Sequence, residues 1–315
     1  MLTVAATHHQ TLITIFQAVV LGVLQGATEL FPISSLGHTV IFPNLFGWHN
    51  IVRWQSQPES PWLAFVVMLH VGSAIGLLIY FWRTWLEIIG GFFRTLARRR
   101  LETATERLAW LIVLATIPVG ILGLLLEHPV RTALAKPLAA SIFLVVNGFI
   151  LAGGEYFRRR SQVREPAVRE GAKPDGGRRL DTLEFRESVV IGTAQTSALI
   201  AGISRDGVVM STGLARGLDH SDAARFAFLL ATPPILAAGI LKVGDLTGKI
   251  HLNSGFATAA QAHDLRIAAL VAAAAAAITA IVTVHFLTRY FKTRTLWPFA
   301  IYCWLFGAAM IAYNA

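Results

Sequence analysis

The sequence predicts an all-α polytopic membrane protein, and its composition and the length of its apolar runs carry that prediction. The chain has 315 residues, of which 55% are hydrophobic and only 14% are charged. A soluble protein of this length would carry far more charge. Several apolar runs approach or exceed the ~20 residues that a helix needs to cross a bilayer. Runs such as 267–284 do not alternate apolar and polar residues as barrel strands do, so the expected environment is a lipid bilayer crossed by helices.

Positive charge collects in two connecting segments of the chain. The net charge is +9, and the Lys and Arg residues concentrate in 94–107 and 158–186. Such clusters indicate cytoplasmic loops under the positive-inside rule, so no nucleic-acid partner is expected. The single cysteine, Cys303, lies in an apolar run and offers neither a disulfide nor a metal cluster. The first ten residues lack the basic start and the cleavage site of a removable signal peptide.

Six apolar runs are long enough to be full spans, and two others are interrupted by polar residues. The expected spans are 62–82, 108–126, 138–157, 223–243, 264–286 and 296–313. The interrupted runs, about 12–46 and about 187–218, each hold two short apolar pieces around a polar break. Neither piece crosses a bilayer alone, so we expect two re-entrant hairpins. Such backbone is tolerated only where protein or a water-filled cavity surrounds it.

The two interrupted runs match each other at a shift of 170 residues. The matches pair Gly22 with Gly192, Gln25 with Gln195, Ser34 with Ser204 and Gly37 with Gly207. They predict a first repeat at 1–157, a basic cytoplasmic linker at 158–186 and a second repeat at 187–315. Placing every basic cluster in the cytoplasm makes the hairpins enter from opposite sides, so the repeats are inverted. In such folds the binding site lies near the midplane, where the broken helices meet.

The polar break of the first hairpin contains a buried acid and two helix-capping residues. Gln25 and Glu29 are four residues apart, so they share one face of a helix. A carboxylate at membrane depth costs at least ~2.5 kcal/mol, which makes Glu29 a functional-site candidate. Pro32 ends this half-helix, and Ser34 and Ser35 are strong N-cap residues for the next one.

The same break is also suited to an anion. Free N–H groups at a helix N-terminus bind anions, and Gly37 allows a ligand to approach closely. Thr28 lies near Gln25 and Glu29 on the first half-helix. His38 follows Ser35 by three residues and could face the same ligand as general acid, general base or nucleophile.

The second hairpin adds a cation. Arg205 is flanked by Ser204 and Gly207, and a guanidinium at membrane depth needs an anion, for which phosphate has the right geometry. The two breaks together fit phosphoryl chemistry on a substrate with an apolar tail. Structural roles for these residues also remain possible, because Ser and Thr in membrane helices often serve in helix packing. Glu29 could be a proton or ion relay, and Arg205 could form a structural ion pair with Asp206.

A histidine lies inside the expected span 62–82. His70 stands alone in 62–82, and we expect it to face the core or line a cavity and not to bind a ligand.

At the two polar breaks the chain resembles the undecaprenyl-diphosphatase family, membrane enzymes linked with bacitracin resistance. Residues 25–38 are similar to the motif (E/Q)-G-x-T-E-x-x-P-x-S-S-x-G-H at nearly every position. Residues 201–207 resemble the motif P-G-x-S-R-S-G less completely, and weaker similarity covers 226–233 and 297–302.

The resemblance implies removal of the terminal phosphate from undecaprenyl diphosphate at the outer side of a bacterial plasma membrane, which recycles a lipid carrier for wall polymers. It also implies a divalent cation, Mg²⁺ or Ca²⁺, and a homodimer. By position, Glu29 would handle metal or water with Gln25 beside it, and Ser35 and His38 would serve in phosphoryl transfer. Ser204 with Arg205 would bind the diphosphate. The rest of the expected substrate site is Thr28, Ser34, Gly37 and Gly207. Ser35, His38 and a metal-activated water all remain candidate nucleophiles.

The chain departs from the family pattern at four positions. Gln25 stands where many members have a second Glu, and Asp206 replaces the Ser of the second motif. Ala201 replaces its Pro, and Val209 stands where Thr is common. The departures leave open a divergent paralogue that acts on another polyprenyl or lipid phosphate. A polyprenyl-phosphate transporter or flippase is an alternative to the phosphatase, since inverted repeats with broken helices also build transporters. An inactive paralogue is a third possibility.

Overall fold

The computed structural model describes residues 12–55, 62–134, 136–164, 177–247 and 259–314. These residues form helices and turns, and the only strand-like pairing among them is an isolated bridge between Arg178 and Leu218. The α-helices are α1 Ile15–Thr28, α2 Ser35–Leu45, α3 His49–Gln55, α4 Trp62–Tyr80, α5 Trp82–Arg98, α6 Ala104–Leu134, α7 Pro137–Arg164, α8 Phe185–Ala194, α9 Arg205–Ala215, α10 His220–Thr247, α11 Ala259–Tyr290 and α12 Trp297–Asn314. Two short 3-10 helices are η1 Leu180–Thr182 and η2 Gln195–Leu199.

Five of the described helices, α4, α6, α7, α10 and α11, are long and apolar enough to cross a membrane. They confirm the predicted class of all-α polytopic membrane protein. The sixth expected span, 296–313, is helical as α12, which has 18 residues. Trp297, Pro298 and Asn314 lie at its ends, and it is not one of these five helices.

Helices extend into segments that the sequence predicts as connections. The predicted basic loop 94–107 begins inside α5, an amphipathic helix that exposes Trp82, Leu86, Ile89 and Phe93 at helical spacing. The predicted linker 158–186 begins inside α7, and its residues 165–176 lie outside the described ranges. The linker and repeat boundaries stay predictions.

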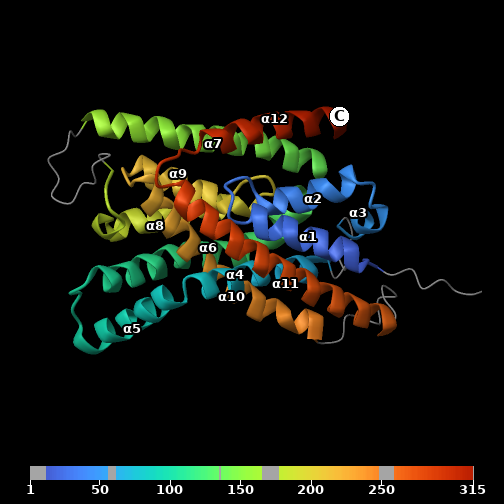
Figure 1. Ribbon diagram of the computed structural model, residues 1–315, viewed down its shortest axis with the longest axis horizontal. Helices are drawn as coiled ribbons and strands as arrows, with labels where there is room; N and C mark the ends of the chain where they lie inside the picture. Colours follow the sequence, from blue (N-terminus) through green and yellow to red (C-terminus); the bar gives the residue numbers. More distant parts are fainter. Residues whose placement is uncertain (1–11, 56–61, 135, 165–176, 248–258, 315) are drawn as a thin grey trace, which may run out of the picture.

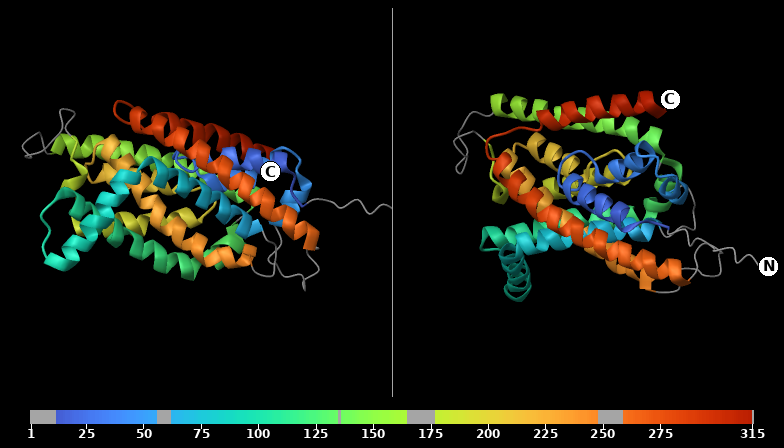
Figure 2. Two further views of the ribbon diagram at one scale, coloured as in Figure 1. Left: turned by 60° about the horizontal axis from the view of Figure 1, so that its bottom comes forward. Right: turned by 45° about the vertical axis from the view of Figure 1, so that its right-hand side comes forward.

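The short helices lie between the long ones (Figures 1 and 2). Helix α1 packs against α11, α8 packs against α6, and α2 and α9 both pack against α7. Helices α7 and α12 run side by side along one edge of the molecule. The larger apolar core surrounds residues 226–231 of α10, and a smaller one joins α1, α3, α4 and α11. Polar residues near the ends of α1 and α8 are thereby held inside the helical assembly.

Two glycines allow the short helices to touch the backbones of the long ones. A Cβ built on Gly22 of α1 would lie 2.3 Å from the carbonyl oxygen of Ala272 in α11. A Cβ built on Gly192 of α8 would lie 2.2 Å from the carbonyl oxygen of Ala115 in α6. Small residues permit this kind of approach between membrane helices. The two glycines are the pair that matches at the shift of 170 residues.

Candidate active site

The turn between α1 and α2 is held by Ser34. As predicted, Ser34 is the N-cap of α2, and its Oγ accepts a hydrogen bond of 3.2 Å from the backbone N–H of Gly37. The same oxygen accepts a second bond of 3.2 Å from the N–H of Gly202, which precedes α9. Ser34 has a φ of 70°, an uncommon value for a residue with a Cβ. Strained backbone of this kind persists where the surrounding structure fixes it, often at functional sites.

The second hairpin repeats this capping. Ser204 is the N-cap of α9, and its Oγ accepts a bond of 3.1 Å from the N–H of Gly207. The starts of α2 and α9 touch, because a Cβ on Gly37 would lie 3.0 Å from the Cα of Gly202. Gly202 has a φ of 103°, which favours glycine. The close approach expected at Gly37 is therefore an approach between the two hairpins.

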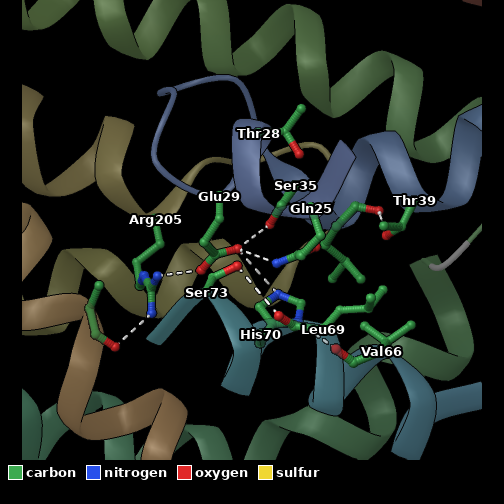
Figure 3. Close-up of polar contacts among 12 residues, drawn as sticks. Gln25, Thr28, Glu29, Ser35, Thr39, Val66, Leu69, His70, Ser73 and Arg205 are labelled. Atoms are coloured by element: carbon green, nitrogen blue, oxygen red, sulfur yellow. Dashed lines mark hydrogen bonds and ion pairs between the residues drawn. The ribbon is translucent and has the colours of Figure 1, made fainter. Parts of the chain in front are cut away.

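The carboxylate of Glu29 is the centre of the polar site (Figure 3). Its Oε2 accepts hydrogen bonds from Gln25 Nε2 at 2.7 Å and from Ser35 Oγ at 2.5 Å. Its Oε1 accepts a bond from Arg205 Nη2 at 2.5 Å. Glu29 is buried, so this ion pair joins the two hairpins in the interior. The structure thus brings together four of the expected site residues.

Arg205 is shared between two carboxylates. Besides its bond to Glu29, its Nη1 donates to the carbonyl oxygen of Ala231 in α10 at 3.1 Å. Its Nε lies 3.6 Å from Oδ1 of Asp206. Asp206 is buried, and within the described part of the chain neither of its carboxylate oxygens has a hydrogen-bond partner. The guanidinium therefore has its Nη groups engaged, while its Nε has only an electrostatic partner.

His70 is a member of this site that the sequence did not identify. It extends from α4, and its Nε2 lies 3.4 Å from Oε2 of Glu29 (Figure 3). Its Nδ1 lies 2.8 Å from the carbonyl oxygen of Val66. The only signal in the sequence was a lone imidazole in an apolar span, which does not reveal what it faces.

Thr28 and His38 have other partners. Thr28 Oγ1 donates to the carbonyl oxygen of Leu24 at 2.8 Å, one turn earlier in α1. His38 Nδ1 lies 2.7 Å from the carbonyl oxygen of Ser34, and Nε2 lies 2.8 Å from the hydroxyl of Tyr302 in α12. Its ring stacks with Tyr302, at a centroid distance of 5.8 Å. Among the described residues no hydrogen bond or ion pair joins His38 to Glu29, and the expected role of His38 in phosphoryl transfer stays a prediction.

Asn147, on α7, links the two turns. It is fully buried, its Nδ2 donates to the carbonyl oxygen of Pro32 at 2.9 Å, and its Oδ1 accepts from the N–H of Ser204 at 2.9 Å. A single side chain thereby satisfies one backbone group in each hairpin. The sequence offered only an Asn in an apolar run, so this positioning role was missed.

The residues around Glu29 fit a divalent cation in part. The amide oxygen of Gln25 is buried and has no partner in the described residues. With the carboxylate of Glu29 it offers the hard oxygen ligands that Mg²⁺ and Ca²⁺ prefer. No group of three or more His, Cys, Asp or Glu side chains gathers in the part of the chain described. A cation would therefore need water or substrate oxygens as well, as Mg²⁺ bound to phosphates commonly does.

The five long apolar helices define a multi-pass membrane protein, and a carboxylate, a hydroxyl and a guanidinium meet in its interior. The chain belongs to the family described as Bacitracin resistance protein BacA, whose sequence pattern matches residues 18–309. This confirms the family indicated by residues 25–38 and 201–207.

Named relatives match the chain over nearly its whole length. The undecaprenyl-diphosphatase 2 of Frankia alni is 48% identical, over 94% of this chain and 96% of that protein. The undecaprenyl-diphosphatase of Mycolicibacterium paratuberculosis is 48% identical, over 95% and 97% of the two chains. That of Acidiphilium cryptum is 41% identical, over 92% and 95%. The similarity therefore includes both hairpins and the helices that hold them.

Proposed function

We propose that this chain is a membrane phosphatase that hydrolyses undecaprenyl diphosphate to undecaprenyl phosphate and inorganic phosphate. The observation that carries the proposal is the meeting of Glu29, Ser35 and Arg205 at one buried point between two hairpins. Relatives named undecaprenyl-diphosphatase, similar over nearly the full length, support the substrate. A transporter and an inactive paralogue are not favoured, because the carboxylate of Glu29, the hydroxyl of Ser35 and the guanidinium of Arg205 are all present at this point.

Ser35 is the nucleophile that the geometry supports best. Its O–H donates to Oε2 of Glu29 over 2.5 Å, so the carboxylate can accept the hydroxyl proton as general base. Oγ then attacks the terminal phosphorus, and the bond to the bridging oxygen breaks to release undecaprenyl phosphate. The leaving undecaprenyl phosphate takes this proton from Glu29, which becomes a carboxylate again. The carboxylate then accepts a proton from a water molecule whose oxygen attacks the phosphoserine, the bond from phosphorus to Oγ breaks, and Glu29 returns the proton to Ser35 as phosphate is released. A water attacking directly would use the same base.

Arg205 binds the diphosphate in this proposal. Its guanidinium matches two phosphate oxygens at once, and charge-assisted bonds of this kind are about twice as strong as neutral ones. Glu29 now holds one of its nitrogens, so an incoming phosphate competes with that carboxylate for Arg205. A divalent cation held by Glu29 and Gln25 would neutralise part of the charge of the diphosphate.

The lipid tail can leave the site along α1. The outward face of that helix exposes Phe16, Val19 and Val23, while Gln25 near its end is fully buried. A substrate with an apolar chain and a charged head needs such a border between bilayer and polar site. This surface supports a lipid diphosphate over a water-soluble one.

We further propose that the hairpins are re-entrant and inverted, and that the site opens to the outer side of a bacterial plasma membrane. Gly22 of α1 packs against α11 and Gly192 of α8 packs against α6, and this matched packing supports the duplication. A cysteine replacing the exposed Phe46, just after α2, tests the orientation, because native Cys303 is buried. We expect an impermeant thiol reagent to label it from outside intact cells. Labelling only after access to the cytoplasm would contradict the proposed opening to the outer side.

The activity is tested by adding undecaprenyl diphosphate and Mg²⁺ to the purified protein and measuring inorganic phosphate. We expect release by the wild type and strongly reduced release by Ser35→Ala and Arg205→Gln. No release under conditions where the Frankia alni relative is active would overturn the proposal. The homodimer stays a prediction.

A further inference from the structure

The two nitrogens of His70 differ in what they face. Nδ1 lies 2.8 Å from the carbonyl oxygen of Val66, which can only accept a hydrogen bond, so Nδ1 carries a proton. In a neutral ring Nε2 then has a free lone pair, which is directed toward Oε2 of Glu29 at 3.4 Å. Two atoms with lone pairs therefore face each other across a short gap.

This gap is wider than a charge-assisted hydrogen bond. A charge-assisted N–H···O bond from an imidazolium would measure about 2.7–2.9 Å, whereas Glu29 and His70 are 3.4 Å apart. Two ligand atoms that each lie about 2.1 Å from one ion are themselves roughly 3.0–3.4 Å apart. The spacing therefore suits two ligands of a single cation.

Gln25 offers a third ligand. Its Oε1 is buried and lacks a partner in the described residues, while its Nε2 donates to Oε2 of Glu29 at 2.7 Å. A half turn of the amide places the oxygen where the nitrogen now lies. A buried oxygen without a partner is costly. A cation beside Glu29 would satisfy it.

We propose that His70 is a nitrogen ligand, together with Glu29 and Gln25, of a divalent cation, and that the imidazole makes this site suitable for a transition cation such as Mn²⁺. Imidazole suits transition cations, whereas Ca²⁺ takes oxygen ligands. The inference rests on the proposed phosphatase function only in that phosphate oxygens would complete the coordination. Three protein ligands from α1 and α4 are present without substrate.

The test uses Mn²⁺ alone with the full-length protein, purified without a polyhistidine tag. Pulsed electron paramagnetic resonance detects the coupling of bound Mn²⁺ to a directly bound imidazole nitrogen. We expect this ¹⁴N coupling in the wild type and its replacement by ¹⁵N coupling when histidine is ¹⁵N-labelled. We expect His70→Gln to lose the coupling and to bind Mn²⁺ at least about tenfold more weakly. Substitutions at metal sites commonly weaken metal binding by this factor or more. His285→Gln is the matched control, because His285 is an exposed histidine of another span and should keep both properties.

Bound Mn²⁺ without nitrogen coupling in the wild type, or coupling that persists in His70→Gln, would overturn the inference. The labelled wild type gives an answer even if His70→Gln does not fold. Phosphate release is measured separately on the same samples. Hydrolysis without nitrogen coupling would support the proposed function and overturn the assignment of His70 as a ligand. Nitrogen coupling without hydrolysis would support His70 as a ligand and overturn the proposed function.

Discussion

The two hairpins are built alike at the start of their second helices and differ in the side chains that they place there. Ser34 and Ser204 each accept a hydrogen bond from the amide three residues later. The next residue, the first of the helix, is Ser35 in α2 and Arg205 in α9. One frame therefore presents a hydroxyl from one half and a guanidinium from the other.

The first helices of the hairpins differ more. Helix α1 continues to Thr28 and ends in Glu29, whereas α8 stops at Ala194 and gives way to a 3-10 turn. The residue that matches Glu29 at a shift of 170 is Leu199.

The paired glutamines show the same division. Gln25 donates to the carboxylate of Glu29, while Gln195 donates to the carbonyl oxygen of Ala115 in α6 at 3.1 Å. The first amide takes part in the site and the second takes part in helix packing. A repeated frame thus carries unequal chemistry, because the first hairpin has an acid at position 29 and the second has leucine at the matching position 199.

The largest expected difference is between Glu29 and Leu199, the matching residues of the two hairpins. Glu29→Gln should lower kcat about 10²–10⁴-fold, the usual contribution of a positioned general base. Leu199→Met, at the matching place in the second hairpin, should leave activity within about twofold. Phosphate release from undecaprenyl diphosphate measures both. Equal losses would mean that Leu199 also contributes to the chemistry.

Substitutions of Asn147 test whether its hydrogen bonds to Pro32 and Ser204 hold the two hairpins together. Asn147→Leu removes the partners of the Pro32 carbonyl and the Ser204 N–H, each buried group costing about 1–3 kcal/mol. We expect a lower Tm in detergent and reduced activity. Asn147→Asp should also be destabilised, because it loses the donor to Pro32 and an ionised carboxylate at membrane depth costs at least ~2.5 kcal/mol. A leucine variant as stable as the wild type would show that water or another group replaces the hydrogen bonds of Asn147.

The glycine pair tests the duplication. Gly22→Ala and Gly192→Ala each drive a Cβ into a carbonyl oxygen of a neighbouring helix, at an expected cost of about 1–3 kcal/mol. Gly153→Ala in α7 is the control, because its Cβ would meet nothing within 4 Å. That variant should be neutral or more stable by up to about 1 kcal/mol. Thermal unfolding of the three variants compares them, and a cost at only one of Gly22 and Gly192 would show that the two helices pack differently.

The smallest expected difference is between the two N-cap residues, Ser34 and Ser204. Ser204→Ala should cost about 1 kcal/mol, the usual value for a lost N-cap. Ser34→Ala should cost more, because its Oγ also accepts from Gly202. Chemical unfolding of the two variants in parallel measures the difference. A smaller cost at Ser34 would mean that the bond to Gly202 adds no stability.

Local patterns predicted the caps and the pairing of Gln25 with Glu29, because three- and four-residue spacings fix which groups meet on a helix. The internal match predicted that Arg205 and Glu29 share a site. His70 and Asn147 were missed, since each reaches the site from a helix distant in sequence. The partner of His38 was also beyond prediction, because Tyr302 lies 264 residues further along the chain.

The central claim is that the two hairpins form one catalytic site through Glu29 and Arg205. A double-mutant cycle of Glu29→Gln, Arg205→Gln and both together, measured as phosphate release from undecaprenyl diphosphate, tests it most directly. Residues that act as a unit are strongly non-additive, so the double variant should be no less active than the weaker single variant. Losses that multiply, or full activity in either single variant, would contradict a shared site.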